Sequence, residues 1–358
     1  MRKTRVVKIG SVKIGGCNPP LIQSMTKCPT QNVTEVLRQI RAIKKAGGHI
    51  VRIAVRNAND AAALKEIRKR TRIPLVADIH FDPQLARLAI NAGVDKIRFN
   101  PGNINKPDKV LEIIKYARHA KIPVRIGVNV GSLPVAWHNK WKHSRDAVCR
   151  GRILANFALK WVRFCETHNF TDLVVSVKSS NVIETISAYR SLRSRTCCPL
   201  HLGVTEAGPG LRSATKSAIG IGTLLAEGIG DTIRVSLSGP PEDEIKVARY
   251  ILQSVGLEKS GIELISCPVC GRAQVEILPL VEKFEREIER RGIEKKTKKL
   301  IKVAIMGCEV NGPGEARSAD IGIAGGKDKF VLFKKGEIVG TVDPSRAVWR
   351  LLTEISRL

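Results

Sequence analysis

The residues best suited to metal chemistry stand near the end of the chain. Cys267 and Cys270 share the short motif C-P-V-C-G-R, and Cys308 follows in the glycine-rich stretch G-C-E-V-N-G-P-G-E-A. Thiolates suit zinc and iron–sulfur clusters. No histidine lies nearby, and the carboxylates Glu309 and Glu315 are the available fourth ligands. We therefore expect a metal centre in which a non-cysteine ligand leaves one metal ion open to substrate.

The same spacing also fits a plain C-x2-C turn, or a zinc ribbon whose remaining ligands come from elsewhere. Nine cysteines are an odd number in a long chain without a secretory signal, which favours reduced thiols over a disulfide framework. Six of them lack ligand-like spacing, and we interpret them as small core residues or bystanders: Cys17, Cys28, Cys149, Cys165, Cys197 and Cys198.

A second group of polar residues comes at the ends of short apolar runs. The group is Ser24, Thr26, Arg52, Arg56, Asp78, His80, Arg98, Asn100, Arg125, Asn129, Lys178, Thr205, Glu206, Arg234 and Ser236. A single arginine among them could be a salt-bridged residue inside a barrel. Several like charges buried together repel one another strongly unless an anion lies among them. The basic members together predict a polyanion site, and we expect its ligand to be phosphate or diphosphate.

Asp78, His80 and Glu206, the members of this group that could act as acids or bases, each have two interpretations. Asp78 and His80 alternate with apolar neighbours in L-V-A-D-I-H-F-D, so they lie on the same face of one strand. They are either an acid–base pair or groups that orient an arginine. Glu206 lies close to Lys178 and Arg234 if the strands close into a barrel. It is either a positioned catalytic acid or a structural partner of a neighbouring arginine.

The elements that position these residues follow a repeated pattern of a β-branched run, a loop and a helical stretch. The candidate strands are 21–26, 49–55, 74–80, 96–100, 123–129, 172–178, 199–205 and 232–237. The candidate helices are 33–46, 60–70, 84–92, 107–120, 147–167, 182–195, 213–227 and 242–255. Strands that are almost continuously apolar indicate a parallel sheet covered by helices.

Eight such units predict a TIM (β/α)8 barrel over residues 1–256. An open doubly wound sheet is the alternative, but G-x-G-x-x-G is absent after the first strand. The 358 residues exceed the ~250 to 300 at which one core stops growing, so we expect a second domain over 257–358. The sequence has no 18-residue apolar run and no signal-peptide pattern, so we expect no membrane partner and a cytoplasmic location.

The net charge of +28 raises nucleic acid as a partner. The basic residues are dispersed, however, and aromatic residues make up only 4% of the chain. No helix-turn-helix, zinc-finger or single-strand stacking pattern accompanies them, so we expect no nucleic-acid binding. Two rival hypotheses remain: a zinc-stabilised nucleic-acid-binding protein, and a phosphate-binding barrel lyase with a merely structural metal domain.

Long blocks of the sequence resemble the 4-hydroxy-3-methylbut-2-en-1-yl diphosphate synthases, the iron–sulfur enzymes of the non-mevalonate isoprenoid pathway. They are L-V-A-D-I-H-F-D, R-F-N-P-G-N-I, R-I-G-V-N-V-G-S-L, V-S-V-K-S-S, P-L-H-L-G-V-T-E-A-G, S-A-I-G-I-G, E-G-I-G-D-T-I-R-V-S-L, C-P-V-C-G-R and G-C-E-V-N-G-P-G-E-A. With only 257–265 between barrel and second domain, the chain resembles the short bacterial form.

The resemblance implies a smaller α/β domain that holds a 4Fe-4S cluster. It implies the cluster ligands Cys267, Cys270, Cys308 and Glu315. The substrate residues it implies are Arg52, Arg98, Asn100, Arg125, Asn129, Lys178, Thr205, Arg234 and Ser236. Its implied catalytic residues are Glu206, Asp78 and His80.

The activity implied is a two-electron reductive ring opening of 2-C-methyl-D-erythritol 2,4-cyclodiphosphate to 4-hydroxy-3-methylbut-2-enyl diphosphate, with loss of water. The sequence has no flavin or nicotinamide fingerprint, so we expect reduced flavodoxin or ferredoxin as a separate electron donor.

We also expect a homodimer. The helix over 242–255 should run about 20 Å from the catalytic face to the opposite end of the barrel. The connector 257–265 could then span at most about 30 Å, which leaves the second domain little freedom to cap its own barrel. A two-fold dimer in which each cluster domain caps the partner's barrel avoids this difficulty.

Overall fold

The structure, a computed structural model, describes residues 3–271, 273–308 and 317–358. The chain divides into two compact units, Met1–Leu257 and Glu258–Leu358, and each unit has its own hydrophobic core. Within the described ranges, no helix combines the length and the apolar character that a membrane crossing requires.

The first unit is built around one parallel sheet of eight strands. They are β3 (Leu21–Met25), β4 (Ile50–Val55), β5 (Leu75–Ile79), β6 (Lys96–Phe99), β7 (Val124–Asn129), β8 (Leu173–Lys178), β9 (His201–Leu202) and β10 (Thr232–Ile233). The sheet order is β8-β7-β6-β5-β4-β3-β10-β9, and a parallel bridge between Val175 and Leu200 joins its two edges. The predicted TIM barrel is therefore confirmed, because the sheet closes on itself.

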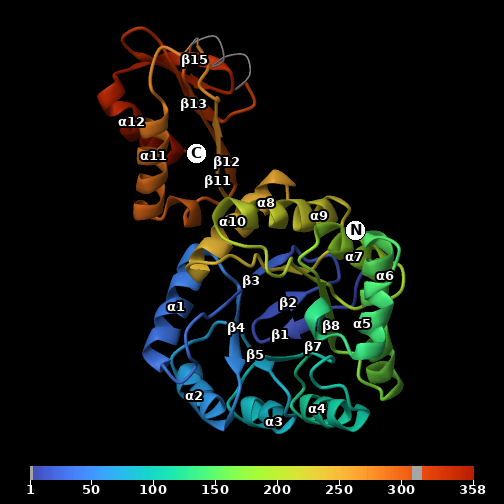
Figure 1. The fold of residues 1–358 in the computed structure, drawn as a ribbon. Coiled ribbons are helices and arrows are strands. Elements are labelled where there is room, and N and C mark those ends of the chain that lie inside the picture. The colour runs from blue at the N-terminus through green and yellow to red at the C-terminus, as the bar shows by residue number, and fades with distance from the viewer. Residues whose placement is uncertain (1–2, 272, 309–316) are drawn as a thin grey trace. The chain divides into compact units, whose positions relative to one another are not determined.

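Helices surround these strands on the outside (Figure 1). They are α1 (Val33–Ala46), α2 (Ala58–Lys69), α3 (Gln84–Asn91), α4 (Pro107–His119), α6 (Ala147–Thr167), α7 (Val182–Arg193) and α10 (Pro241–Ser254). Side-chain caps begin several of them: Asn57 accepts a hydrogen bond from the backbone of Asp60, and Asp146 accepts one from that of Cys149. These caps set where each helix starts and so fix the loop that carries each strand-end residue.

Four details differ from the sequence expectation. The last two barrel strands are only two residues long, and the helix expected over 213–227 is divided into α8 (Gly210–Ser217), a π-helical turn (Ala218–Gly222) and α9 (Thr223–Ala226). A short helix, α5 (Val135–Lys142), was not predicted, because none of its residues is buried. The fourth detail is an N-terminal hairpin that the sequence analysis missed.

That hairpin, β1 (Val7–Ile9) and β2 (Val12–Ile14), closes the N-terminal end of the barrel. Its buried side chains pack against Ile50, Val76 and Val174, which stand near the starts of β4, β5 and β8. The turn requires Gly10, whose φ is +55° and whose added Cβ would lie 2.6 Å from Asp95 Oδ1. An apolar plug therefore seals the barrel opposite the expected active site.

The second unit is a five-stranded mixed sheet with two helices. Its strands are β11 (Gly261–Ser266), β12 (Leu300–Met306), β13 (Ile321–Gly325), β14 (Phe330–Lys334) and β15 (Glu337–Val342), in that order, and the first three are parallel. Helices α11 (Leu278–Arg291) and α12 (Ala347–Ile355) pack on one face. Because β11 already begins at residue 261, the connector is shorter than the expected 257–265.

Candidate active site

Four basic side chains point into the barrel from four of its strands. Arg52, Arg98, Arg125 and Lys178 come from β4, β6, β7 and β8, and each is at most 7% exposed. Side chains alternate between the two faces of a strand, and the residues on either side of each arginine, like Val177 before Lys178, belong to the apolar face that packs against the helices. We call these four residues the cationic cradle.

Asp78, from β5, is the central counter-ion of this cradle. Its Oδ1 accepts a hydrogen bond from Arg98 Nη1 at 2.7 Å, and its Oδ2 lies 3.5 Å from Arg52 Nε. Burial would raise the pKa of Asp78, but the charges of Arg98 and Arg52 outweigh burial and lower that pKa below its ordinary range. Asp78 is therefore ionised at neutral pH, which favours the interpretation that it orients arginines.

Two glycines provide the space that the cradle needs. An added Cβ at Gly127 would lie 2.6 Å from Arg98 Nε, and one at Gly203 would lie 2.7 Å from Lys178 Nζ. Real Cβ contacts essentially never come this close. Both strands therefore omit a side chain at the level where a neighbouring cation crosses the barrel.

The cradle carries more positive charge than its protein partners neutralise. Burial is the main cause that lowers the pKa of Lys178 and of Arg125, and it lowers the pKa of Arg52 to about 9. Arg125 Nε and Nη1 and Arg98 Nε are buried without a hydrogen-bond partner among the described residues. Buried donors rarely remain unsatisfied, so this arrangement fits an anionic ligand.

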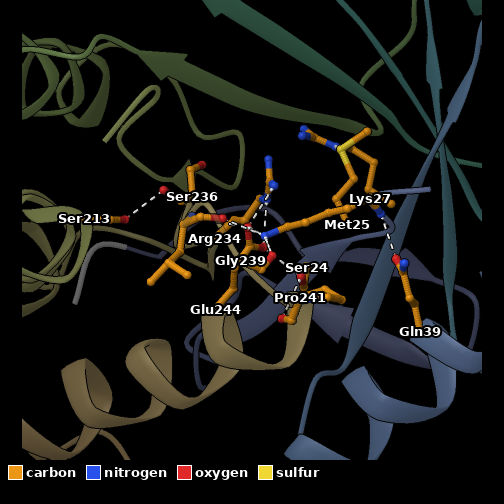
Figure 2. Close-up of polar contacts among 12 residues, drawn as sticks. Ser24, Met25, Lys27, Gln39, Ser213, Arg234, Ser236, Gly239, Pro241 and Glu244 are labelled. Atoms are coloured by element: carbon orange, nitrogen blue, oxygen red, sulfur yellow. Dashed lines mark hydrogen bonds and ion pairs between the residues drawn. The ribbon is translucent and has the colours of Figure 1, made fainter. Parts of the chain in front are cut away.

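Arg234, the fifth predicted cation, has a carboxylate partner. Its Nη2 lies 3.2 Å from Glu244 Oε1, and Lys27 Nζ lies 3.1 Å from the same oxygen (Figure 2). Glu244 also accepts a 2.7 Å hydrogen bond from Ser24 Oγ, although it is 1% exposed. Burial would raise the pKa of Glu244, but Arg234 and Lys27 lower it. This network anchors the start of α10 to β3 at the mouth of the barrel.

His80 stands just beyond β5, with Nε2 3.9 Å from Asp78 Oδ2. Burial lowers its pKa below 6.5, and Arg98 and Arg52 add to this effect against the opposing charge of Asp78. The imidazole is therefore neutral at pH 7 and can accept or donate a hydrogen bond. It lies closer to the solvent than the cradle, since its side chain is 32% exposed.

Glu206 lies in the loop after β9 and is exposed, with a backbone φ of +52°. It makes no hydrogen bond or ion pair with the residues that the structure describes, so the structure does not pair it with Lys178 or Arg234. A left-handed conformation is costly for a glutamate and is often found at functional sites.

The remaining predicted substrate residues make hydrogen bonds between uncharged groups. Asn100 donates a 2.7 Å hydrogen bond to Ser132 Oγ, and Ser132 in turn donates to the carbonyl of Asn129. The backbone of Thr205 donates to the carbonyl of Ser179, and the carbonyl of Ser236 accepts from Ser213 Oγ (Figure 2). These contacts hold the loops around the cradle.

Sequence reasoning missed three charged residues of this region: Lys27, Glu244 and the completely buried Lys96 at the start of β6. It considered only the last residues of each strand. The alternation K-I-R-F-N, which puts Lys96 on the same face as Arg98, was a signal that could have found Lys96. Glu244 stands in the first turn of a helix, where an acidic residue is expected for the helix dipole alone.

In the second unit, the two cysteine motifs meet at the ends of neighbouring strands. The backbone N–H of Gly307 donates a 3.2 Å hydrogen bond to Cys267 Sγ, and the carbonyl of Gly307 accepts one from the backbone of Gln274. Cys308, the next residue, is buried. Cys270 is exposed and accepts a backbone hydrogen bond from Ala273 across the turn. The Cys267 motif and Cys308 are therefore neighbours.

The fourth predicted ligand, Glu315, lies outside the described residues. Among the residues that are described, no three His, Cys, Asp or Glu side chains already converge as a metal site. All nine cysteines are thiols. The donor set of three thiols with an N–H···S hydrogen bond fits an iron–sulfur cluster better than a hard metal ion.

The comparisons with known proteins cover both units. Residues 4–249 match the GcpE TIM-barrel domain, and residues 263–357 match the GcpE protein C-terminal domain. The 4-hydroxy-3-methylbut-2-en-1-yl diphosphate synthase (flavodoxin) of Persephonella marina is 48% identical, over 100% of this chain and 98% of the relative. The enzyme of the same name from Clostridium acetobutylicum is 49% identical, over 99% of both.

Solved structures agree on the fold of the barrel alone. A Yersinia pestis dihydropteroate synthase in a sulfonamide drug complex has a TM-score of 0.51 at 12% identity, over 71% of this chain and 100% of that one. Because both family domains match in chain order and full-length relatives are nearly half identical, the chain belongs to the GcpE family.

Proposed function

We propose that the chain catalyses the reductive ring opening of 2-C-methyl-D-erythritol 2,4-cyclodiphosphate to 4-hydroxy-3-methylbut-2-enyl diphosphate. The reaction takes up two electrons, breaks a ring C–O bond and releases one hydroxyl oxygen as water. The observation that carries the proposal is the cationic cradle, in which Asp78 is the one carboxylate within ion-pair distance of any of the four basic side chains among the described residues. A diphosphate supplies the negative charge that this pocket lacks, and the GcpE relatives are named for making a diphosphate product.

In this proposal the cradle binds and orients the diphosphate. The cradle is preorganised before the diphosphate binds. Asp78 fixes the Arg98 guanidinium before substrate arrives, so little side-chain entropy is lost on binding. Arg125 and Lys178 provide charges that are not committed to a carboxylate. The proposed substrate contacts also include Arg52 and, near the mouth, Asn100, Asn129, Thr205, Arg234 and Ser236.

Glu206 is proposed to donate the proton that allows the substrate hydroxyl to leave as water. Its exposed side chain and its left-handed backbone on the loop after β9 support this role. His80, neutral at pH 7 and 3.9 Å from Asp78, is proposed to hydrogen-bond the substrate at the edge of the cradle.

We further propose that Cys267, Cys270, Cys308 and Glu315 hold a 4Fe-4S cluster in Glu258–Leu358. When bound, this group supplies electrons one at a time and a Lewis-acidic iron. The protein's contribution is a thiol set steadied by the Gly307 hydrogen bond, together with one carboxylate that substrate oxygen can replace more easily than a thiolate.

These ligand roles are tested by comparing two variants purified without air. Cys308→Ser should lose the cluster, whereas Glu315→Gln should retain part of the iron and lose most of the activity. If both variants lose iron and activity equally, Glu315 is an ordinary structural ligand and its exchangeable role is wrong.

The electron donor is proposed to be reduced flavodoxin or ferredoxin. The names of the relatives specify flavodoxin, and a net charge of +28 favours association with acidic electron carriers. A cytoplasmic location, where such donors and reduced thiols occur, is part of the same proposal.

We propose a homodimer in which the cluster domain of each chain caps the barrel of the other. Helix α10 ends at Ser254 and β11 begins at Gly261, so the connector has six residues and, fully extended, spans at most about 25 Å. Because α10 starts at the barrel mouth and its 14 residues extend about 21 Å away from it, such a connector can hardly return the second domain to the mouth.

Mixed dimers test this arrangement. A Lys178→Ala chain and a Cys308→Ser chain, each inactive alone, are co-expressed with different tags and assayed together. Random mixing should restore about one quarter of wild-type activity, since half of the dimers then contain one intact site out of two. Purified mixed dimers without activity would show that each cluster serves its own barrel.

A further inference from the structure

A second set of buried polar side chains lies towards the N-terminal end of the barrel interior. Lys96 is two residues before Arg98 on β6, and Gln23 is two residues before Met25, which contacts Arg52. Residues two apart on a strand point to the same face about 6.6 Å from each other. Together with His201, at the start of β9, Gln23 and Lys96 form what we call the lower polar layer.

The two-residue alternation along a strand also points His201 into the barrel interior. It is two residues before Gly203, where an added Cβ would touch Lys178 Nζ, and its Nδ1 lies 2.8 Å from Thr232 Oγ1 on β10. The three residues of the layer are all 0% exposed. The layer therefore lies at the N-terminal end of the barrel interior, next to the apolar plug, where Lys96 pairs with Val76 and Arg125 pairs with Val174.

Most polar atoms of this layer have no hydrogen-bond partner among the described residues. The unpaired atoms are Gln23 Nε2 and Oε1, Lys96 Nζ and His201 Nε2, and Arg125 Nε and Nη1 are also unpaired. Completely buried donors are seldom left without an acceptor. A ligand bound inside the barrel would supply the missing acceptor.

The charge balance indicates that this ligand is an anion. The barrel interior holds five basic side chains, Arg52, Lys96, Arg98, Arg125 and Lys178, against the carboxylate of Asp78. If the proposed function holds, the cyclic diphosphate adds about two negative charges, because each of its phosphate groups keeps one ionisable oxygen. With all five basic side chains protonated, the substrate alone would leave the interior positively charged.

Lys96 lies among these like charges. Burial is the largest cause that lowers its pKa, and the charges of Arg125 and Arg52 lower it further. A bound anion would reverse this effect and allow Lys96 to remain protonated. The apolar side chains of Ile50, Val76 and Val174 close the N-terminal end of this interior, so an anion must enter from the mouth.

We propose that the lower polar layer binds one small inorganic anion of halide size, held by Lys96 and Arg125 beneath the substrate site. The anion supplies the acceptor that Arg125 Nε and Nη1 lack among the described residues. It thereby holds that guanidinium in place for the diphosphate above.

Thermal unfolding of the whole chain, purified with its metal, provides the first test. Melting temperatures are measured in sodium chloride and in sodium gluconate at equal ionic strength. Chloride should raise the melting temperature by about 5 °C and the effect should saturate. Lys96→Met should abolish the difference, whereas Lys65→Met, at an exposed position on α2, should preserve it. A wild-type protein with no chloride effect would overturn the proposal.

Bromide provides the second test and needs only the wild-type chain. Crystals grown with the cyclodiphosphate are soaked in bromide, whose anomalous signal identifies it. A peak within hydrogen-bond distance of Lys96 Nζ and Arg125 supports the proposal. Ordered water alone at that place, or bromide that binds only at surface sites, overturns it. Neither test involves turnover, so a negative result leaves the proposed function standing.

Discussion

Replacing Lys178 by methionine should separate substrate binding from stability, with effects in opposite directions. Lys178 is 5% exposed, and it makes no ion pair or hydrogen bond with the residues that the structure describes. Methionine fills a similar volume beside Gly203 without the charge. The substitution therefore removes a cation that the substrate uses and the folded protein without substrate does not.

The loss of binding follows from the charge-assisted contacts of an ammonium group with a phosphate. Removing them should cost about 2 to 3 kcal/mol, or roughly 30- to 150-fold in Kd. Stability should instead remain equal or rise. The folded-state pKa of Lys178 lies below 10.5, so the unfolded chain binds more protons at alkaline pH. Wild-type stability should then increase as pH rises towards about 10, and the variant should lose this slope.

Calorimetric titration with the cyclodiphosphate measures the affinity, and urea unfolding between pH 7 and pH 10 measures the stability. Lys65→Met serves as the matched control, because it removes the same charge from an exposed site. The reasoning is refuted if Lys178→Met binds substrate within threefold of wild type. A loss of several kcal/mol in unfolding free energy would also refute it, since Lys178 would then be a structural residue.

Three further substitutions probe neighbouring parts of the site. Asp78→Asn should lower the unfolding free energy at pH 7 by about 3 to 5 kcal/mol, because it leaves Arg98 buried without its counter-ion. That contribution should disappear as pH falls below about 4 through the depressed pKa of Asp78, so wild type and variant should converge in acid. Gly127→Ala should displace Arg98 and cost about 1 to 3 kcal/mol of stability, whereas Gly131→Ala, whose Cβ meets nothing within 4 Å, should be neutral in urea unfolding. Glu206→Gln should bind substrate normally and lower turnover by about 10²- to 10⁴-fold, and equal losses in both would indicate a binding role instead.

The sequence predicted the barrel strands well where both faces of a strand are buried. Strands such as β7 and β8 are almost continuous apolar runs, and their observed bounds lie within one residue of the expected ones. The pattern failed where burial does not control structure. Helix α5 buries no residue, and the π-helical turn at Ala218–Gly222 lies in a run whose buried positions keep the three- to four-residue spacing of an uninterrupted helix.

The sequence predicted which residues line the site, but it did not predict which of them contact one another. Strand alternation placed Arg52, Arg98 and Arg125 in one interior. Strand alternation could not show that Asp78 accepts a hydrogen bond from Arg98, because that contact joins side chains of two different strands. Nor could it show that Arg234 faces Glu244, whose position depends on how α10 packs.

Turnover by the iron-loaded chain tests the central claim most directly. The protein is purified without air, its iron content is measured, and the cyclodiphosphate is added with reduced flavodoxin. Our account predicts about four iron ions per chain and the formation of 4-hydroxy-3-methylbut-2-enyl diphosphate, with two electrons consumed for each molecule. A colourless protein that contains zinc, or an iron-loaded protein that binds the cyclodiphosphate and leaves it unchanged, would contradict the account.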